Sequence, residues 1–560
     1  MRTVAGNEDA QRAVGGEAAV AASGGLPEPR RHPRILTAGD WFAIGAVALV
    51  CGLAAFVGIP ELREFEHDIF FPLDNAYRVL QGQIPHRDFA SAWGPVFYLV
   101  EAAGLEISRL RPEGLAYANA LFGAVVALWM YAAARARLAP VQASTLAIYT
   151  ALLITAPFAL GFNPLAFCFA MGYNRFGYAL LGIIVVECGF EALAPDAARA
   201  RWPGRAFAAG AAWALLVFLK ISYAAVAVPF LLLWLCCGSQ RLRRLAALCC
   251  GAGAVTAVLL SYLRLNLAGI FRDLADAASG RSGSWHPAAM LSGPVIVECI
   301  PLLLLAALLT AGTGKRSSSD ARWRQTRLWL FVLLTAAVGG FLLATNHQSM
   351  TLPLGGFAAL VLVDGAMARG ERPYRLAAGF LAGLCFLPLA LMNAVSLGAA
   401  SWERIRGPQT AAVRLTAERG RSIVFGPVES AMTSETGGPA YVEALNDGLR
   451  LIRAHAGAGE GVMTMDTLNP FNYLLNRPSP RGGMASAYYS LVFSDRAHPS
   501  AERFFGDARY VLLRKYSKTV EDAPIEEYLL DGLRRVYGPA LEERFVPVEE
   551  TAHWIFYRRK

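Results

Sequence analysis

Charged residues are scarce in this chain of 560 residues. Asp, Glu, Lys and Arg together make up 17% of the sequence, whereas a soluble globular protein carries about 25%. The 9 cysteines all precede Ser401 and lie in or beside apolar stretches, and none has the spacing to histidines that a zinc site requires. These absences exclude a disulfide framework and an evident metal–thiolate site, and they indicate that the cysteines are small buried apolar side chains.

The motifs of several other protein classes are absent as well. The sequence contains no Walker A motif, no HExxH and no GxSxG. It therefore does not support ATP-driven transport or the catalytic chemistries that HExxH and GxSxG carry. The net charge is +9, but much of it lies in short loops between apolar stretches, as the positive-inside rule expects. The charge therefore does not indicate nucleic-acid binding.

Long apolar stretches are what the sequence has instead. Hydrophobic residues make up 55% of the chain, and segments long enough to span a bilayer recur from Trp41 to Leu397. The sequence after them is polar and charged and contains no such segment. We therefore predict a disordered cytoplasmic tail over residues 1–39, a polytopic α-helical transmembrane domain over residues 40–398 and a soluble α/β domain over residues 399–560.

The predicted α/β domain shows one clear helix and three strand patterns. "YVEALNDGLRLIRAHA" has apolar residues at helical spacing. "GVMTMDT" and "ARYVLLRKY" have the composition of strands, and "HWIFYRR" that of a late edge strand. These patterns do not determine the fold of the domain.

The distribution of basic residues predicts the orientation of the chain. Basic loops, beginning with "RRHPR" before the first span, alternate with turns that are poor in charge. Because basic loops face the cytoplasm, the alternation predicts a cytoplasmic N-terminus, about eleven spans and an extracytoplasmic C-terminal domain. It requires that residues 94–110, which include Glu101 and Glu106, form an interfacial or re-entrant helix. If residues 94–110 instead cross the membrane, the chain has about twelve spans and the C-terminal domain is cytoplasmic.

The first predicted outer loop, residues 61–95, is acidic although it follows a membrane span directly. Within it, Pro72 and Gly82 suit the start and the end of a short amphipathic helix on the membrane surface. Asp74 falls in the first turn of that helix, where the helix dipole favours a carboxylate. Asp68 precedes the helix, and no local capping role accounts for it. An ionised carboxylate at this boundary can accept a proton from a substrate.

Other polar residues of this loop have two interpretations each. His67 is an interfacial histidine or a catalytic partner of Asp68. Asp88 caps a turn or contacts a substrate, and Arg87 is a surface cation or a substrate contact.

The loop resembles the acidic first outer loop of the GT-C superfamily of membrane glycosyltransferases. In a frequent bacterial version, an acid after the first span is followed by a glycine, "PYRDF", "GP" and an aromatic-rich helix. Asp68, Gly82, "IPHRDF" and "GPVFYLV" follow that order and spacing here. The match is similar to the branch of protein O-mannosyltransferases and aminoarabinose transferases, which use polyprenyl-phosphate sugars.

The sequence departs from the family pattern at two positions. Ile69 stands where a second acid is common, and His86 stands where tyrosine is usual. If a paired acid is required, Glu66, His67 or Asp74 must supply the second function.

The resemblance implies sugar transfer from a polyprenyl phosphate to a cell-envelope acceptor on the periplasmic side of the inner membrane, with inversion at the anomeric carbon. Such a displacement needs one base near the acceptor, here Asp68, and cations near the departing phosphate. The acceptor stays open among lipopolysaccharide core, lipid A, a polysaccharide and a protein. A divalent cation that bridges Asp68 and the phosphate also stays open, because no ligand set is convincing.

Candidate phosphate and sugar contacts lie at the predicted outer turns. Lys220 interrupts a long apolar run where the chain must turn around, and a lysine there is costly unless it is paired or faces water. Arg175 lies at another outer end. Snorkelling and interfacial anchoring are the alternative explanations for these two cations. His347 is a plain polar turn residue or a lipid-phosphate contact, and Trp285 and His286 stack on a sugar or anchor at the interface.

Two other functions compete with the glycosyltransferase. A transporter or lipid flippase should show internal repeats and charges near mid-membrane, whereas the unexplained charges here gather at one face. The third interpretation is a non-catalytic membrane scaffold with an extracytoplasmic binding domain. The sequence favours the glycosyltransferase.

Overall fold

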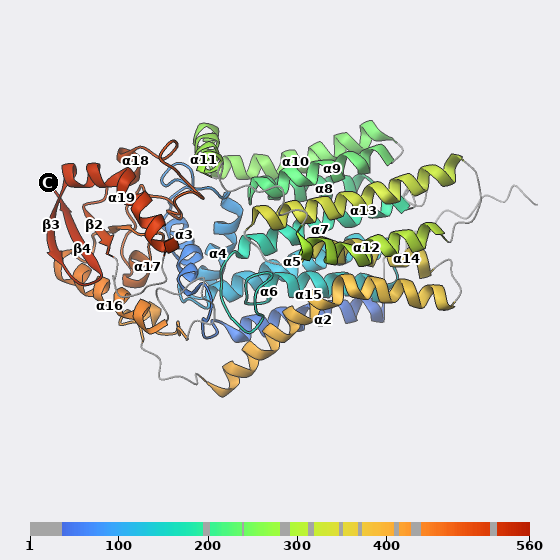
Figure 1. Cartoon of the computed structure of the whole chain (residues 1–560), viewed down its shortest axis with the longest axis horizontal. Coiled ribbons are helices and arrows are strands. Elements are labelled where there is room, and N and C mark those ends of the chain that lie inside the picture. Colours follow the sequence, from blue (N-terminus) through green and yellow to red (C-terminus); the bar gives the residue numbers. More distant parts are fainter. Residues whose placement is uncertain are drawn as a thin grey trace, which may run out of the picture.

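A computed structural model gives the arrangement of most of the chain. A bundle of long helices occupies one end of the molecule and a small α/β domain the other, and α3 and α4 lie between them (Figure 1). The predicted N-terminal tail is almost wholly outside the described residues. The described ranges are 36–193, 202–237, 240–280, 292–311, 319–346, 351–367, 372–407, 414–426, 438–515 and 524–560.

Apolar helices form the bundle, as the sequence predicts. Of these helices, 6 are long and apolar enough to cross a membrane, and α6, α9, α12 and α14 contain shorter apolar segments. The chain is therefore a polytopic α-helical membrane protein. The number of crossings and the sides on which the termini lie stay predictions. The bundle helices are α2 (Ala38–Val57), α5 (Gly114–Arg135), α6 (Pro140–Thr155), α7 (Gly172–Leu193), α8 (Trp202–Val217), α9 (Ile221–Cys237), α10 (Arg241–Tyr262), α12 (Gly293–Ala311), α13 (Ser319–Thr345), α14 (Pro353–Met367) and α15 (Arg372–Arg406).

Helix α7 lies at the centre of the bundle. Its most apolar window is 94% buried, whereas the corresponding window of α10 is 22% buried and faces outward. Close packing on α7 depends on small residues, as it does in membrane bundles generally. A β-carbon at Gly177 would lie 2.8 Å from the ring of Tyr223. The glycine thus lets α9 approach α7 next to the turn that carries Lys220.

Helix α4 (Pro95–Ile107) is short. Its 13 residues extend about 20 Å, less than the hydrocarbon core of about 30 Å. It packs between α3 and α5, and Glu101 on it is buried whereas Glu106 is exposed. An interfacial or re-entrant helix over residues 94–110 stays a prediction.

Helix α3 (Phe70–Leu80) follows the short 3₁₀ helix η2 (Glu66–Ile69). The prediction that it lies on the membrane surface with one polar face in water is wrong, because every residue from Phe70 to Arg78 is buried. The C-terminal domain covers its polar face: Asn75 Nδ2 donates to Ala485 O at 2.9 Å, and Arg78 Nη1 donates to Gly482 O at 3.1 Å. Backbone carbonyls therefore replace the water that the amphipathic pattern predicts.

The explanation of Asp74 by the helix dipole is also wrong. Because α3 begins at Phe70, no acidic residue lies in its first turn. Asp74 Oδ2 instead pairs with Arg78 Nε at 2.9 Å, one turn further along the helix, and the two side chains are 3% and 1% exposed. Burial raises the pKa of Asp74, although Arg78 acts to lower it. The pair is a buried structural interaction at the junction of the two parts.

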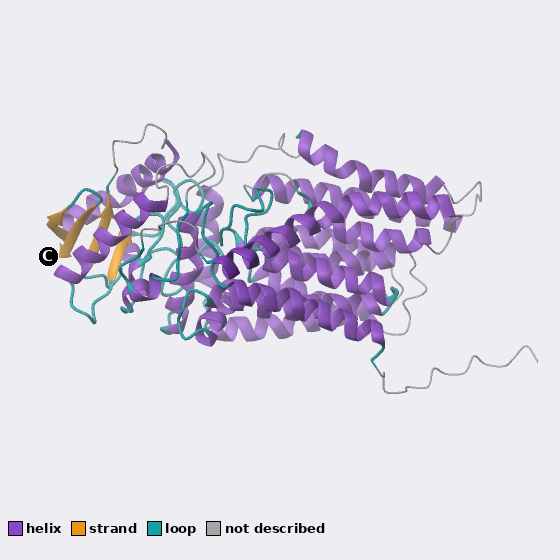
Figure 2. Ribbon diagram, turned by 90° about the horizontal axis from the view of Figure 1, so that it is seen from below, coloured by secondary structure: helices purple, strands orange, loops and turns teal. Residues whose placement is uncertain are grey.

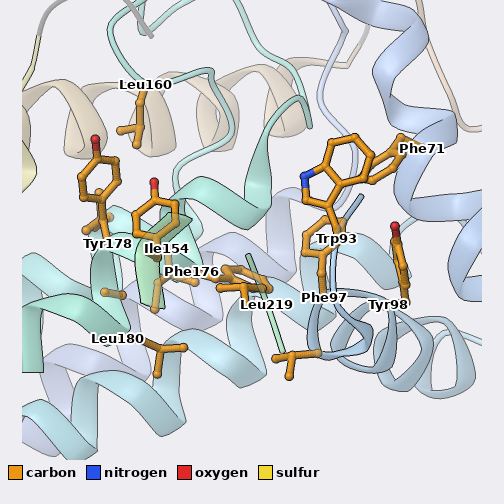
Figure 3. Packing of buried hydrophobic residues seen from close by; sticks show 14 of the residues in the cluster. Phe71, Trp93, Phe97, Tyr98, Ile154, Leu160, Phe176, Tyr178, Leu180 and Leu219 are labelled. Carbon is orange, nitrogen blue, oxygen red and sulfur yellow. The ribbon is translucent and has the colours of Figure 1, made fainter. Parts of the chain in front are cut away.

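An aromatic cluster connects α3 to α4 and α7. The ring of Phe71 lies 4.8 Å from Trp93, 5.8 Å from Phe97 and 6.0 Å from Tyr173. Figure 3 shows the side chains of Phe71, Trp93, Phe97 and Tyr98 close to one another. The cluster fixes the start of α3, and with it the residues of η2, against the bundle.

The C-terminal domain contains a four-stranded sheet with strand order β1-β2-β4-β3. Strands β1 and β2 are parallel, and the β2–β4 and β4–β3 pairs are antiparallel. Helices pack around the sheet at the end of the molecule (Figure 2). The elements of this domain are η6 (Glu418–Gly420), α16 (Gly438–His455), β1 (Val462–Met465), α17 (Phe471–Leu475), α18 (Ala501–Phe505), β2 (Tyr510–Arg514), α19 (Pro524–Arg544), β3 (Phe545–Glu550) and β4 (Trp554–Arg559).

The predicted helix and strands of this domain are confirmed, with one correction. β4 is a central strand and not an edge strand, because β3 pairs along its outer side. The sequence did not indicate β3, which contains Pro547. Proline lacks the N–H that a central strand requires, and it is tolerated here because β3 is itself at the edge.

The acidic loop, residues 61–95, and the C-terminal domain are joined by backbone hydrogen bonds. Leu62 N donates to Val424 O at 2.9 Å, and Ala90 exchanges bonds with Gly483 and Ala485 at 3.0 and 2.8 Å. Helix α15 runs without a break past residue 398, where the sequence predicts the domain boundary. Residues 61–95 therefore form a folded segment that packs between the helix bundle and the C-terminal domain.

We expect Arg78→Met to destabilise the protein by about 3–5 kcal/mol, because the substitution leaves Asp74 buried without its cation. The midpoint of thermal unfolding of the detergent-purified protein measures the effect. Arg450→Met is the matched control, since Arg450 forms ion pairs with Asp447 and Glu549 but is 55% exposed, and it should change little. Equal midpoints for the two variants would contradict a stabilising role for the buried pair.

Candidate active site

Asp68 lies at the junction of the bundle and the C-terminal domain. Its side chain is 18% exposed, and its Oδ1 accepts a hydrogen bond from Tyr488 Oη at 2.8 Å. His67 Nε2 lies 3.1 Å from the same hydroxyl oxygen and 3.5 Å from Asp68 Oδ1. Asp68 is therefore a partly buried carboxylate with fixed partners, and His67 lies beside it as predicted.

The connection between α6 and α7 packs against the acidic loop just before Asp68. Arg63 N donates to Phe167 O at 3.0 Å, and the ring of Phe65 lies 5.1 Å from that of Phe162. Burial is the main cause that raises the pKa of the Cys168 thiol on this connection to about 12.

Lys220 occupies the turn between α8 and α9, as the sequence predicts, and is 7% exposed. Its Nζ donates to Asn174 Oδ1 at 2.9 Å and to Asn346 Oδ1 at 2.6 Å. The same atom lies 4.9 Å from the centre of the Tyr173 ring. Neutral amide oxygens and an aromatic face hold the ammonium in place without cancelling its charge.

The turn that carries Lys220 is tied to the acidic loop. Gly94 N donates to Leu219 O at 3.1 Å, and Val96 N donates to Phe218 O at 3.0 Å. A β-carbon at Gly94 would lie 2.0 Å from Phe218 O, so only glycine permits this approach. The "GP" of the sequence motif is therefore where the loop meets the lysine turn.

Asp68 and Lys220 border the same aromatic cluster. Phe71 follows Asp68 within one turn, and its ring lies 6.0 Å from that of Tyr173. The ring of Tyr173 in turn lies 4.9 Å from Lys220 Nζ. The structure thus gathers a carboxylate and an ammonium at the end of the bundle that faces the C-terminal domain.

Arg175 has a different environment from the one predicted for a phosphate contact. It is 3% exposed, and it donates to Phe158 O, Leu153 O and Asn393 Oδ1 at 2.5 to 3.1 Å. Four of its five N–H groups are thereby used. Arg175 holds the carbonyls of the α6–α7 connection, and a phosphate could reach it only by displacing them.

Asp88 and Arg87 form a local turn. Asp88 Oδ2 accepts from Ile84 N at 2.8 Å and from Arg87 Nη2 at 2.8 Å. Burial acts to raise the pKa of Asp88, but the hydrogen bonds from Arg87 and Ile84 outweigh it and lower the pKa below its ordinary value. The turn-capping interpretation of Asp88 accounts for these contacts.

A buried cluster that the sequence did not indicate lies behind this turn. Asp273 of α11 (Leu267–Gly280) is 1% exposed, and its Oδ2 lies 3.0 Å from His86 Nδ1. Its Oδ1 accepts from Arg503 Nη1 at 2.5 Å, and Arg503 Nη2 donates to His86 O at 2.9 Å. The cluster clamps the acidic loop between α11 and the C-terminal domain.

The remaining predicted contacts cannot be placed. Trp285, His286 and His347 lie outside the described residues. No group of three or more His, Cys, Asp or Glu side chains in the described part of the chain is close enough to hold a metal ion.

Comparisons with known proteins give a distant likeness. No protein-family model and no curated protein matches the chain. Among solved structures, the chain is similar to "Crystal Structure of ArnT from Cupriavidus metallidurans bound to Undecaprenyl phosphate", with 14% identity, a TM-score of 0.44 and coverage of 93% of this chain and 98% of that one. The apo state of the same protein is similar with 12% identity, a TM-score of 0.38 and coverage of 93% and 97%.

We expect Arg503→Met to loosen the clamp at Asp273. The carboxylate then stays buried with His86 and Ser91 N as its remaining hydrogen-bond partners in the described part of the chain, and breaking a buried ion pair costs about 3–5 kcal/mol. Faster hydrogen exchange at the amides of α11, measured by mass spectrometry, is the expected result. Arg509→Met is the matched control, because Arg509 pairs with Glu460 in the same domain but is 65% exposed. Unchanged exchange in α11 would contradict the clamp.

Proposed function

We propose that this protein is an inverting membrane glycosyltransferase of the GT-C type that transfers a sugar from a polyprenyl phosphate to a cell-envelope acceptor. The single observation that carries the proposal is that one aromatic cluster connects Phe71, three residues after Asp68, with Tyr173, whose ring lies against Lys220. A base and a phosphate-binding cation are the two groups that such a displacement needs. The order of residues in the acidic loop is a second, independent support.

The chemistry assigns one role to each group. Asp68 accepts the proton of the acceptor hydroxyl or amine as the acceptor atom attacks the anomeric carbon. The bond between that carbon and the phosphate oxygen breaks, its electron pair leaves with the polyprenyl phosphate, and the configuration is inverted. Lys220 stabilises the negative charge that develops on the departing phosphate.

The environment of the two groups suits these roles. Asp68 is 18% exposed, so a polar acceptor can approach it from the C-terminal side. Lys220 is 7% exposed and lies among the ends of apolar helices, where a lipid-borne phosphate would be anchored by its hydrocarbon tail. Partial removal from water strengthens the attraction between the ammonium and a phosphate. We propose that the reaction takes place at the periplasmic face of the inner membrane.

We expect Asp68→Asn to lower kcat by a factor of at least about 10²–10⁴, the usual contribution of a general base. The assay uses radiolabelled polyprenyl-phosphate sugars extracted from cells that lack the protein, with the envelopes of those cells as acceptor. Mass spectrometry of envelope glycolipids with and without the protein identifies the product. Full transfer by a well-folded Asn variant would exclude Asp68 as the base, and accumulation of substrate in vesicles without covalent transfer would indicate a transporter instead.

We expect Lys220→Met to lower kcat by about 10²–10³, the usual loss when one donor to a developing oxyanion is removed. Initial rates against donor concentration in the same assay give kcat and KM separately. Lys515→Met is the control, since Lys515 pairs with Glu550 on the C-terminal domain. Kinetic constants equal to those of the wild type would remove Lys220 from the mechanism.

A further inference from the structure

The C-terminal domain places one side chain directly on the proposed base. Tyr488 precedes β2 in the chain and is 420 residues from Asp68, yet its hydroxyl donates to Asp68 Oδ1 at 2.8 Å. The single proton of the phenol is donated to Asp68. The Tyr488 hydroxyl oxygen therefore accepts a hydrogen bond from His67 Nε2, 3.1 Å away. His67, Tyr488 and Asp68 therefore form a directed chain of hydrogen bonds that ends on the carboxylate.

The backbone just before Tyr488 fixes its position. Ala485 N donates to Ala90 O at 2.8 Å, which joins this segment to the acidic loop. Ala487 N donates to Thr467 O at 2.8 Å, which joins it to the end of β1. The tyrosine thus reaches Asp68 from a segment that is held by the loop on one side and by the sheet on the other.

We infer that Tyr488 is a positioning residue for the base Asp68 and makes the C-terminal domain part of the active site. The inference rests on the proposed function. The hydroxyl holds Oδ1, and within the described part of the chain Oδ2 receives no hydrogen bond from a side chain or amide, so Oδ2 is the oxygen that takes the proton of the acceptor. Tyr488 itself exchanges no proton with the substrate.

The test compares Tyr488→Phe with Tyr489→Phe, its neighbour in the chain. Tyr489 also donates to a carboxylate, Asp495, at 2.5 Å, so the two substitutions remove the same kind of bond from the same segment. We expect Tyr488→Phe to lower kcat about tenfold, because the base loses its fixed orientation, with little change in the KM for the extracted polyprenyl-phosphate sugar. Tyr489→Phe should leave both unchanged.

A second measurement distinguishes the loss of the hydrogen bond from a folding defect in the Tyr488→Phe variant. Incorporation of 3-fluorotyrosine at Tyr488 keeps the shape of the side chain and keeps a hydroxyl that can donate to Asp68, so kcat should return to near the wild-type value. A wild-type kcat for Tyr488→Phe, with an active wild type, would overturn the inference and leave the proposed function standing. Absence of transfer by the wild type would overturn the proposed function, and the inference with it.

Discussion

The contact between the acidic loop and the C-terminal domain is the interaction on which the rest of the structure depends. Residues 61–95 carry the candidate base, but their polar face cannot satisfy itself within a bundle of apolar helices. Carbonyls at Ala485 and Gly482 accept hydrogen bonds from Asn75 and Arg78, and α3 is buried as a result. Buried polar groups without partners are costly. The acidic loop therefore depends on the C-terminal domain for its hydrogen-bond partners.

The local features of the candidate site could be predicted from sequence. Asp68 and Lys220 both stand out in the sequence, because the neighbouring residues give neither charged side chain a local structural role. The strands β1 and β2 were recognised from their composition alone. These features depend on short segments, and periodicity and residue type describe short segments well.

The partners of those groups could not be predicted, because they come from distant parts of the chain. Tyr488 is 420 residues from Asp68, and Arg503 is 230 residues from Asp273. Arg175 looked available for a phosphate because its partners are mostly backbone carbonyls, which no residue pattern reveals. The burial of α3 was missed for the same reason: an amphipathic pattern shows that a face is polar, but not whether water or another domain covers it.

Helix α15 has a mechanical consequence for the whole molecule. Its 35 residues measure about 52 Å, roughly 20 Å more than the hydrocarbon thickness. The ion pair of Arg63 and Glu403, 2.9 Å long, ties the last turn of this helix to the acidic loop. The far end of a bundle helix therefore anchors the segment that carries Asp68.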